Sequence, residues 1–189
     1  FMVVLPEHDT VIAMFSCTGD MQFVLDAMWE HLLPALGDPA DRRDRGTGGD
    51  EVLAARMATL TLPTVAKRLG GRVPVDVGAA RFRPSDSEPS HVTVTGIGTD
   101  GQRMTIHEQD GSISVPLTEQ WTVDGSIAAS ATRLDDGRVA VDLSFLHTPH
   151  RLEVELDPAT ATFVARWPLM PLFGIGADHR LAALRSLPD

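Results

Sequence analysis

The 189-residue sequence is poor in several residue types on which common protein chemistry depends. It contains no tyrosine, a single lysine (Lys67) and a single cysteine (Cys17). One cysteine excludes an internal disulfide and slightly favours a reducing compartment such as the cytoplasm. Aromatic residues make up 5% of the chain and hydrophobic residues 43%, so a buried core must be mainly aliphatic.

Positive charge is also scarce. Asp and Glu number 26 against 16 Lys and Arg, which gives a formal net charge of −10, and the one basic run is Arg42-Arg43-Asp44-Arg45. Because phosphates and anionic lipids attract clustered cations, we expect neither nucleic acid nor a membrane surface as a partner. No apolar run approaches the roughly 20 residues that span a bilayer.

Residues 1–36 have the pattern of a β-hairpin followed by a helix. Two apolar runs, residues 1–5 and 10–15, flank the polar turn Pro6-Glu7-His8-Asp9. Asp20 is the predicted helix N-cap, and Pro34 is predicted to lie close to the helix end. Apolar residues recur along one helix face at Met21, Val24, Leu25, Met28 and Leu32. A hairpin and one helix cannot bury a core alone, so we expect this region to be the tail of a larger domain.

The stretch VVLPEHDTVIAMFS…GDMQFVLDAMWEHLLPAL resembles the end of the β-lactamase-related serine hydrolases, which include penicillin-binding-protein-like enzymes and esterases. The LPEHD turn and the WEHLLPAL helix end are its most specific pieces. The resemblance implies that residues 1–36 are the last two sheet strands and the C-terminal helix of a catalytic domain. A looser similarity, from about Gly111 to Leu184, is to the lipocalin-like C-terminal accessory domain of some members.

The catalytic motifs of that family are absent from this chain. The family uses a Ser-x-x-Lys motif, a Tyr-x-Asn motif and a Lys/His-x-Gly strand, all of which would lie upstream of Phe1. Thr64, rather than serine, stands at the position that precedes Lys67 in such a motif. Without nucleophile, lysine and tyrosine no acyl-enzyme can form. We therefore predict no catalytic residue and no cofactor in this chain, and a missing catalytic domain as its partner.

Residues 37–50 combine glycine, proline and alternating charge without an apolar anchor, which predicts a linker. Residues 51–189 would then form the accessory domain. The domain should open with a helix over residues 51–60, with Asp50 as N-cap and Pro63 beyond its end. Val52, Leu53, Met57 and Leu60 lie along one side of that helix. Residues 65–69 predict a further short helical turn.

From about Val77 the period of the apolar residues changes to two, which predicts strands. Val139, Val141, Leu143 and Phe145 should be buried on one face, with Leu152, Val154 and Leu156 of a partner strand facing the same core. Further strands are predicted over residues 79–83, 91–98, 103–108, 112–115 and 120–132, the last one broken at Asp124-Gly125.

Tight Asp-Gly turns separate these strands, at residues 100–101, 110–111 and 136–137. Short connections favour sequential antiparallel pairing. About eight strands predict a strongly curved sheet, either a closed lipocalin-like barrel or an open half-barrel. The predicted class for the whole chain is therefore α+β, with an N-terminal hairpin and helix before a mainly antiparallel β domain.

Candidate site residues are few. Trp121, Phe145, Phe163 and Trp167 could line a ligand cavity in an open barrel, although small barrels usually fill their interior with side chains. His147 and His150, together with His91 and His107, could hold zinc, but the His147-x-x-His150 spacing straddles a turn. Cys17 precedes a helix N-terminus that could activate a thiol, whereas most free cysteines are buried apolar groups.

Two functions follow from these patterns. The first is the C-terminal part of a β-lactamase-related serine hydrolase, whose accessory domain shapes substrate access or holds protomers together. The second is a stand-alone lipocalin-like module that binds a small apolar ligand. We also expect the chain to form a homo-oligomer through residues 1–36 (Phe1 to Leu36), because an uncovered apolar sheet edge recruits another chain.

Overall fold

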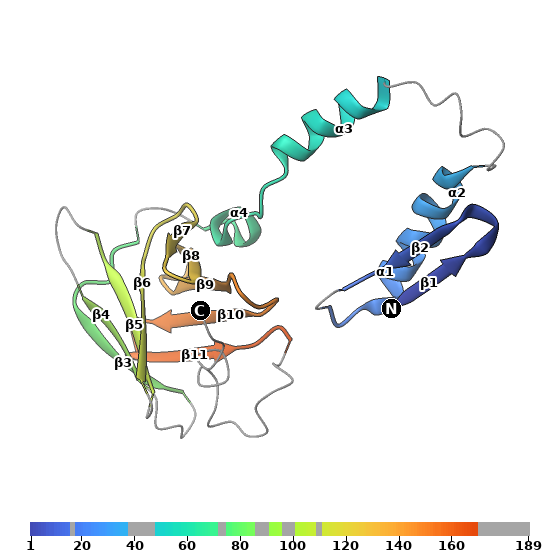
Figure 1. Ribbon diagram of the computed structural model, residues 1–189. Coiled ribbons are helices and arrows are strands. Elements are labelled where there is room, and N and C mark those ends of the chain that lie inside the picture. Colours follow the sequence, from blue (N-terminus) through green and yellow to red (C-terminus); the bar gives the residue numbers. More distant parts are fainter. Residues whose placement is uncertain are drawn as a thin grey trace. The chain divides into compact units, whose positions relative to one another are not determined.

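The computed structural model describes residues 1–15, 18–37, 48–71, 75–85, 91–95, 101–108 and 111–169 (Figure 1). The chain divides into two compact units, Phe1–Leu62 and Pro63–Asp189. Each unit is described by itself. In the described part of the chain no helix is both long and apolar enough to cross a membrane.

The first unit opens with the predicted hairpin. Strands β1 (Met2–Leu5) and β2 (Thr10–Ala13) pair antiparallel, with Val3 opposite Ile12 and Val4 opposite Val11. The single 3-10 turn η1 (Pro6–His8) joins them, and Asp9 closes it in the left-handed region at φ 46°. Asp tolerates this region better than most residues, which is the physical reason for its place in the turn.

The helix that follows has three consecutive parts, α1 (Met21–Ala27), the π-helical turn η2 (Met28–Leu32) and α2 (Leu33–Leu36). The predicted N-cap is confirmed, because Asp20 Oδ1 accepts the Phe23 N–H at 3.0 Å. Pro34 lies inside the helix, which continues to Leu36. Proline has no N–H and crowds the preceding turn. The wider turn, in which the Leu33 N–H reaches the Met28 carbonyl, relieves that crowding.

Helix α3 (Gly48–Thr59) begins earlier than predicted, so residues 48–50 are helical and do not belong to the linker. The prediction of Asp50 as N-cap is therefore wrong. Asp50 and Glu51 lie in the first turn, where a carboxylate interacts favourably with the helix dipole. The apolar residues of this helix remain exposed, and α3 falls within the first unit rather than with the β domain.

The second unit contains the short helix α4 (Val65–Leu69), as predicted, and a nine-stranded sheet. Its strands are β3 (Ala80–Pro84), β4 (His91–Thr95), β5 (Arg103–Glu108), β6 (Gly111–Pro116), β7 (Thr122–Asp124), β8 (Ile127–Arg133), β9 (Val139–Phe145), β10 (Arg151–Asp157) and β11 (Thr162–Arg166).

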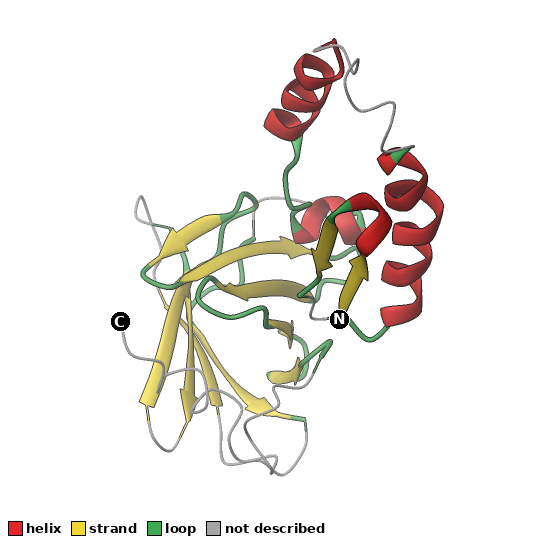
Figure 2. Cartoon of the chain, turned by 45° about the vertical axis from the view of Figure 1, so that its right-hand side comes forward, coloured by secondary structure: helices red, strands yellow, loops and turns green. Residues whose placement is uncertain are grey.

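The order in the sheet is β6-β5-β4-β3-β11-β10-β9-β8-β7, so sequential strands pair antiparallel in two groups. Figure 1 labels these strands, and Figure 2 shows them in yellow. The one parallel pair, β3 with β11, joins the groups. Strand direction alternates along the chain, and the number of strands is odd. The first strand, β3, and the last, β11, therefore point in the same direction, which explains why they pair parallel. Two residues beyond β6, the Thr118 carbonyl accepts the Ala131 N–H of β8 at 2.7 Å. The mainly antiparallel, barrel-like sheet that the sequence predicts is thus confirmed.

The predicted register of the core strands is also confirmed. Leu143 lies opposite Leu152, Val141 opposite Val154 and Val139 opposite Leu156, and all six are buried. Further buried side chains of the β domain join them in one cluster, which includes Phe82, Val94, Met104, Ile106, Ile113, Val115, Ala129, Ala131, Phe145, Phe163 and Trp167. One continuous apolar cluster therefore supports the β domain.

We predict that Leu143→Ala lowers the free energy of unfolding by about 2–5 kcal/mol, because it leaves a cavity at the centre of this cluster. Urea denaturation followed by tryptophan fluorescence measures the loss. Val123→Ala on β7 is the matched control, since Val123 is exposed, and should change stability by less than about 0.5 kcal/mol. Equal effects of the two substitutions would contradict the described packing.

Candidate functional site

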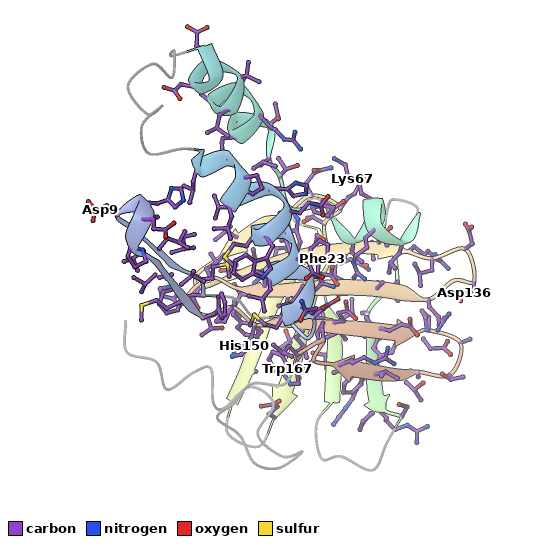
Figure 3. All side chains as sticks on the ribbon, turned by 90° about the vertical axis from the view of Figure 1, so that its right-hand side faces the viewer. Asp9, Phe23, Lys67, Asp136, His150 and Trp167 are labelled. Atoms are coloured by element: carbon purple, nitrogen blue, oxygen red, sulfur yellow. The ribbon has the colours of Figure 1, made fainter. Side chains whose placement is uncertain are left out.

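Three of the predicted site residues meet at the end of the barrel where β9 ends and β10 begins. The rings of Phe145 and Trp167 lie 5.7 Å apart with a 32° tilt. His150 meets the Trp167 ring edge-on at 6.2 Å (Figure 3). Phe145 and Trp167 belong to the packed core cluster, as does Phe163. Their rings therefore contribute packing in the interior, and Trp121 lies half-buried outside that cluster.

The indole of Trp167 carries an unusual feature. Its Nε1–H is buried and has no hydrogen-bond acceptor among the residues that the structure describes. A buried donor without a partner costs about 1–3 kcal/mol, and such unsatisfied donors are rare in folded proteins.

The histidines named as zinc candidates do not converge. His147 is exposed in the β9–β10 turn, while His150 is half-buried against Trp167. On the other side of the sheet His91 and His107 are register partners, and His107 Nε2 lies 2.9 Å from Thr93 Oγ1. Among the described residues no group of three His, Cys, Asp or Glu side chains could hold a metal ion. Ser16 and Cys17 lie outside the described residues.

Sequence reasoning missed where helix α4 packs, which is on the outer face of β8 and β9. Thr64 caps α4, and the Val65 N–H donates to Ser130 Oγ at 3.0 Å. Arg68 Nη2 donates to both oxygens of Asp142, at 2.8 and 3.0 Å. Asp142 is only 2% exposed as a result. Alternation with Val141 and Leu143 puts Asp142 on the outward face of β9, and helix α4 covers that face at this position.

The chain leaves α4 through a contact that only glycine permits. A Cβ on Gly71 would lie 2.2 Å from Thr132 Oγ1 and 2.8 Å from Thr132 Cβ. Thr132 is fully buried, so it has no room to move away. Gly71 thereby lets the backbone pass directly over β8, which holds α4 close to the sheet.

The sheet register explains why α4 carries an arginine. It places Asp142 directly opposite Glu153, and Glu153 directly opposite Arg166. Like charges facing each other across strands are destabilising. Arg68 relieves this repulsion, because the same Nη2 also lies 3.3 Å from Glu153. Arg151 provides Glu153 with a second cation.

Beside this network lies a groove of about 330 Å³ on the outer face of β9, β10 and β11. Its sides include Leu69 of α4 and Val164 of β11, and Ala140 forms part of its floor. Arg68, Asp142, Glu153, Glu155 and Arg166 supply its charged groups. The groove can therefore offer both apolar walls and guanidinium donors.

The opposite end of β9 has an exposed charge pair. Arg138 donates to Asp136, and its second contact is to Glu155 (Figure 3 labels Asp136). The Arg138 hydrogen bond holds the pKa of the Asp136 carboxyl below its usual value, and Asp136 in turn raises the pKa of Arg138. Both groups are solvated, so this pair fixes the β8–β9 turn without adding much stability.

Comparisons with protein-family models, with curated proteins and with solved structures found no match to this chain. The resemblance to the serine hydrolases therefore rests on the residues quoted for it, and the family remains a proposal.

We predict that Arg68→Met destabilises the protein by about 3 kcal/mol, because it leaves the buried Asp142 carboxylate unpaired. The double variant Arg68→Met/Asp142→Leu should recover most of that loss, since it removes both charges. Arg81→Met, at an exposed position on β3, is the matched control. Urea denaturation of all four proteins gives the comparison. A double variant no more stable than Arg68→Met alone would contradict the assignment.

Proposed function

We propose that this chain is the C-terminal part of a β-lactamase-related serine hydrolase. Phe1–Leu36 would supply the last hairpin and helix of the catalytic domain, and the lipocalin-like β domain would be an accessory domain. The accessory domain would shape access to the active site or hold protomers together. The nucleophile and its base would come from the catalytic domain, because this chain has one lysine and no tyrosine.

The observation that carries the proposal is the β1–β2 hairpin, which is apolar on both faces. Val3 and Ile12 on one face are half-buried, whereas Met2, Val4 and Val11 on the other are exposed by 68%, 59% and 63%. A sheet that is apolar on both faces is typical of a central sheet covered by helices on both sides. Two strands alone are marginally stable in water. Both points agree with the role that the resemblance implies for these residues.

The packing of the β domain supports an accessory role better than a ligand-carrying one. A lipocalin-like carrier needs an interior that apolar side chains leave empty. Here the inward residues of both groups of strands, including three of the four candidate aromatic residues, form one buried cluster. The surface of the domain is then what would contact the catalytic domain, a substrate or a second protomer.

The reading frame that encodes this chain is the most direct test of the proposal. We expect a Ser-x-x-Lys motif upstream of the Phe1 codon in the same frame. The full protein should then react with a fluorophosphonate probe at that serine, and a Ser→Ala variant should not. A frame without the motif, or a full protein that neither reacts with the probe nor hydrolyses esters, would contradict the proposal.

The chain of 189 residues is expected to be inactive by itself. Without a serine activated by lysine, it should hydrolyse neither a chromogenic cephalosporin nor short-chain nitrophenyl esters above the rate of a heat-denatured sample. Activity that remains after purification and is lost in Ser16→Ala or Cys17→Ala would show that the chemistry lies in this chain.

The same chain is expected to self-associate, because its hairpin face and strand edges have no cover. Neither β1 nor β2 contains a charged residue, so pairing between copies meets no like-charge repulsion. Light scattering should therefore give a mass above the 20.4 kDa of one chain. The variant Val4→Lys/Val11→Glu, which puts opposite charges on a facing pair, should be a monomer. Val123→Lys is the control and should associate like the parent; a monomeric parent at high concentration would contradict the prediction.

A further inference from the structure

The groove on the outer face of β9–β11 contains cationic groups that the ion-pair network does not use. In that network Arg68 bridges Asp142 and Glu153, Arg151 pairs with Glu153, and Arg138 pairs with Glu155. Each carboxylate that lines the groove thus has an arginine. The groups available to a ligand are therefore the arginine N–H donors that do not contact any of these carboxylates.

Arg166 is the main remaining donor. It lines the groove from β11, is exposed, and its side chain has no ion pair or hydrogen bond in the described part of the chain. Arg68 uses only Nη2 for its contacts with Asp142 and Glu153, which leaves its Nε and Nη1 donors. A guanidinium presents its N–H groups in a planar fork that matches a carboxylate.

The walls of the groove are apolar next to these donors. Leu69 and Val164 are exposed by 46% and 40%, and the small, buried side chain of Ala140 also lines the groove. A volume of about 330 Å³ is at the small end of the range for ligand sites. Free cationic donors beside apolar walls complement a ligand with one carboxylate and a short apolar body.

We propose that this groove binds an amphiphilic monocarboxylate, with the carboxylate on Arg166 and the apolar part against Val164 and Leu69. A medium-chain fatty acid and the C-terminal residues of an apolar peptide share this chemistry. The site lies wholly within the second unit and does not depend on the proposed hydrolase function. If the groove does not bind a carboxylate, the hydrolase proposal is unaffected. If the hydrolase proposal is wrong, the groove can still bind a carboxylate.

The experiment is a titration of the full chain with decanoate below its micelle concentration. Binding is measured by calorimetry and by changes in amide chemical shifts. N-acetyl-Leu-Leu with a free C-terminus forms the second arm, and decylamine and the peptide amide, neither of which has a carboxylate, are the controls. We expect one saturable site for at least one carboxylate and none for either control. Amide shifts should concentrate on β10, β11 and α4.

Variants connect the binding to the groove. Arg166→Glu should weaken binding roughly tenfold or more, because it removes a charge-assisted hydrogen bond. Arg166→Gln should have a smaller effect, and Arg81→Glu on the exposed face of β3 should have none. If only decanoate binds, the ligand of the groove is a fatty acid. If only the peptide binds, the ligand is the C-terminus of a polypeptide chain. No saturable binding of either carboxylate, or equal binding by Arg166→Glu, would overturn the proposal.

Discussion

The β domain depends on one constraint: nine strands that are apolar on one face must remove that face from water. Curling the sheet until its two edges approach each other does so without a second layer, since the inward side chains then pack against one another. The inward-facing residues of β9 and β10, such as Leu143, Val154 and Leu156, are almost completely buried by this arrangement. The parallel contact between β3 and β11 follows, because an odd number of alternating strands brings two that run in the same direction together.

The outer face of the same sheet shows how a few polar contacts can position a short helix. A five-residue helix has little stability of its own. α4 is held instead by the bond from Val65 to Ser130, by the Arg68–Asp142 pair and by the close passage of Gly71 over Thr132. The buried pair gains little net energy compared with apolar packing, but it fixes where the helix lies. That position in turn forms one side of the groove in which Arg166 lies.

Much of the β domain could be predicted from sequence because its signals are local. Alternation over residues 139–145 and 151–157 gives both the strands and the face that is buried, and Asp-Gly pairs mark turns. The burial of Asp142 could not be predicted, because its cover comes from Arg68, 74 residues away. Likewise, the like-charge contact of Asp142 with Glu153 exists only once the register is known. Three of the four candidate aromatic residues, Phe145, Phe163 and Trp167, belong to the core cluster, but sequence cannot distinguish a filled interior from an open one.

The first unit, unlike the second, has almost no buried core among its described residues. Met28 is the one fully buried hydrophobic side chain among its described residues, and Phe15 is 97% exposed. Local signals, such as the Asp20 cap and the Pro6–Asp9 turn, therefore specify its elements without giving them a common core. The uncovered apolar side chains of the hairpin are the feature from which the proposed function is argued.

Native-state hydrogen exchange of the Val4→Lys/Val11→Glu variant, which is expected to be a monomer, tests this difference most directly. Amides of β8, β9 and β10 should exchange only when the whole β domain unfolds, whereas those of β1 and β2 should exchange through local opening at a much lower free energy. Equal protection of the hairpin and of β9, in a sample shown to be monomeric, would contradict the account.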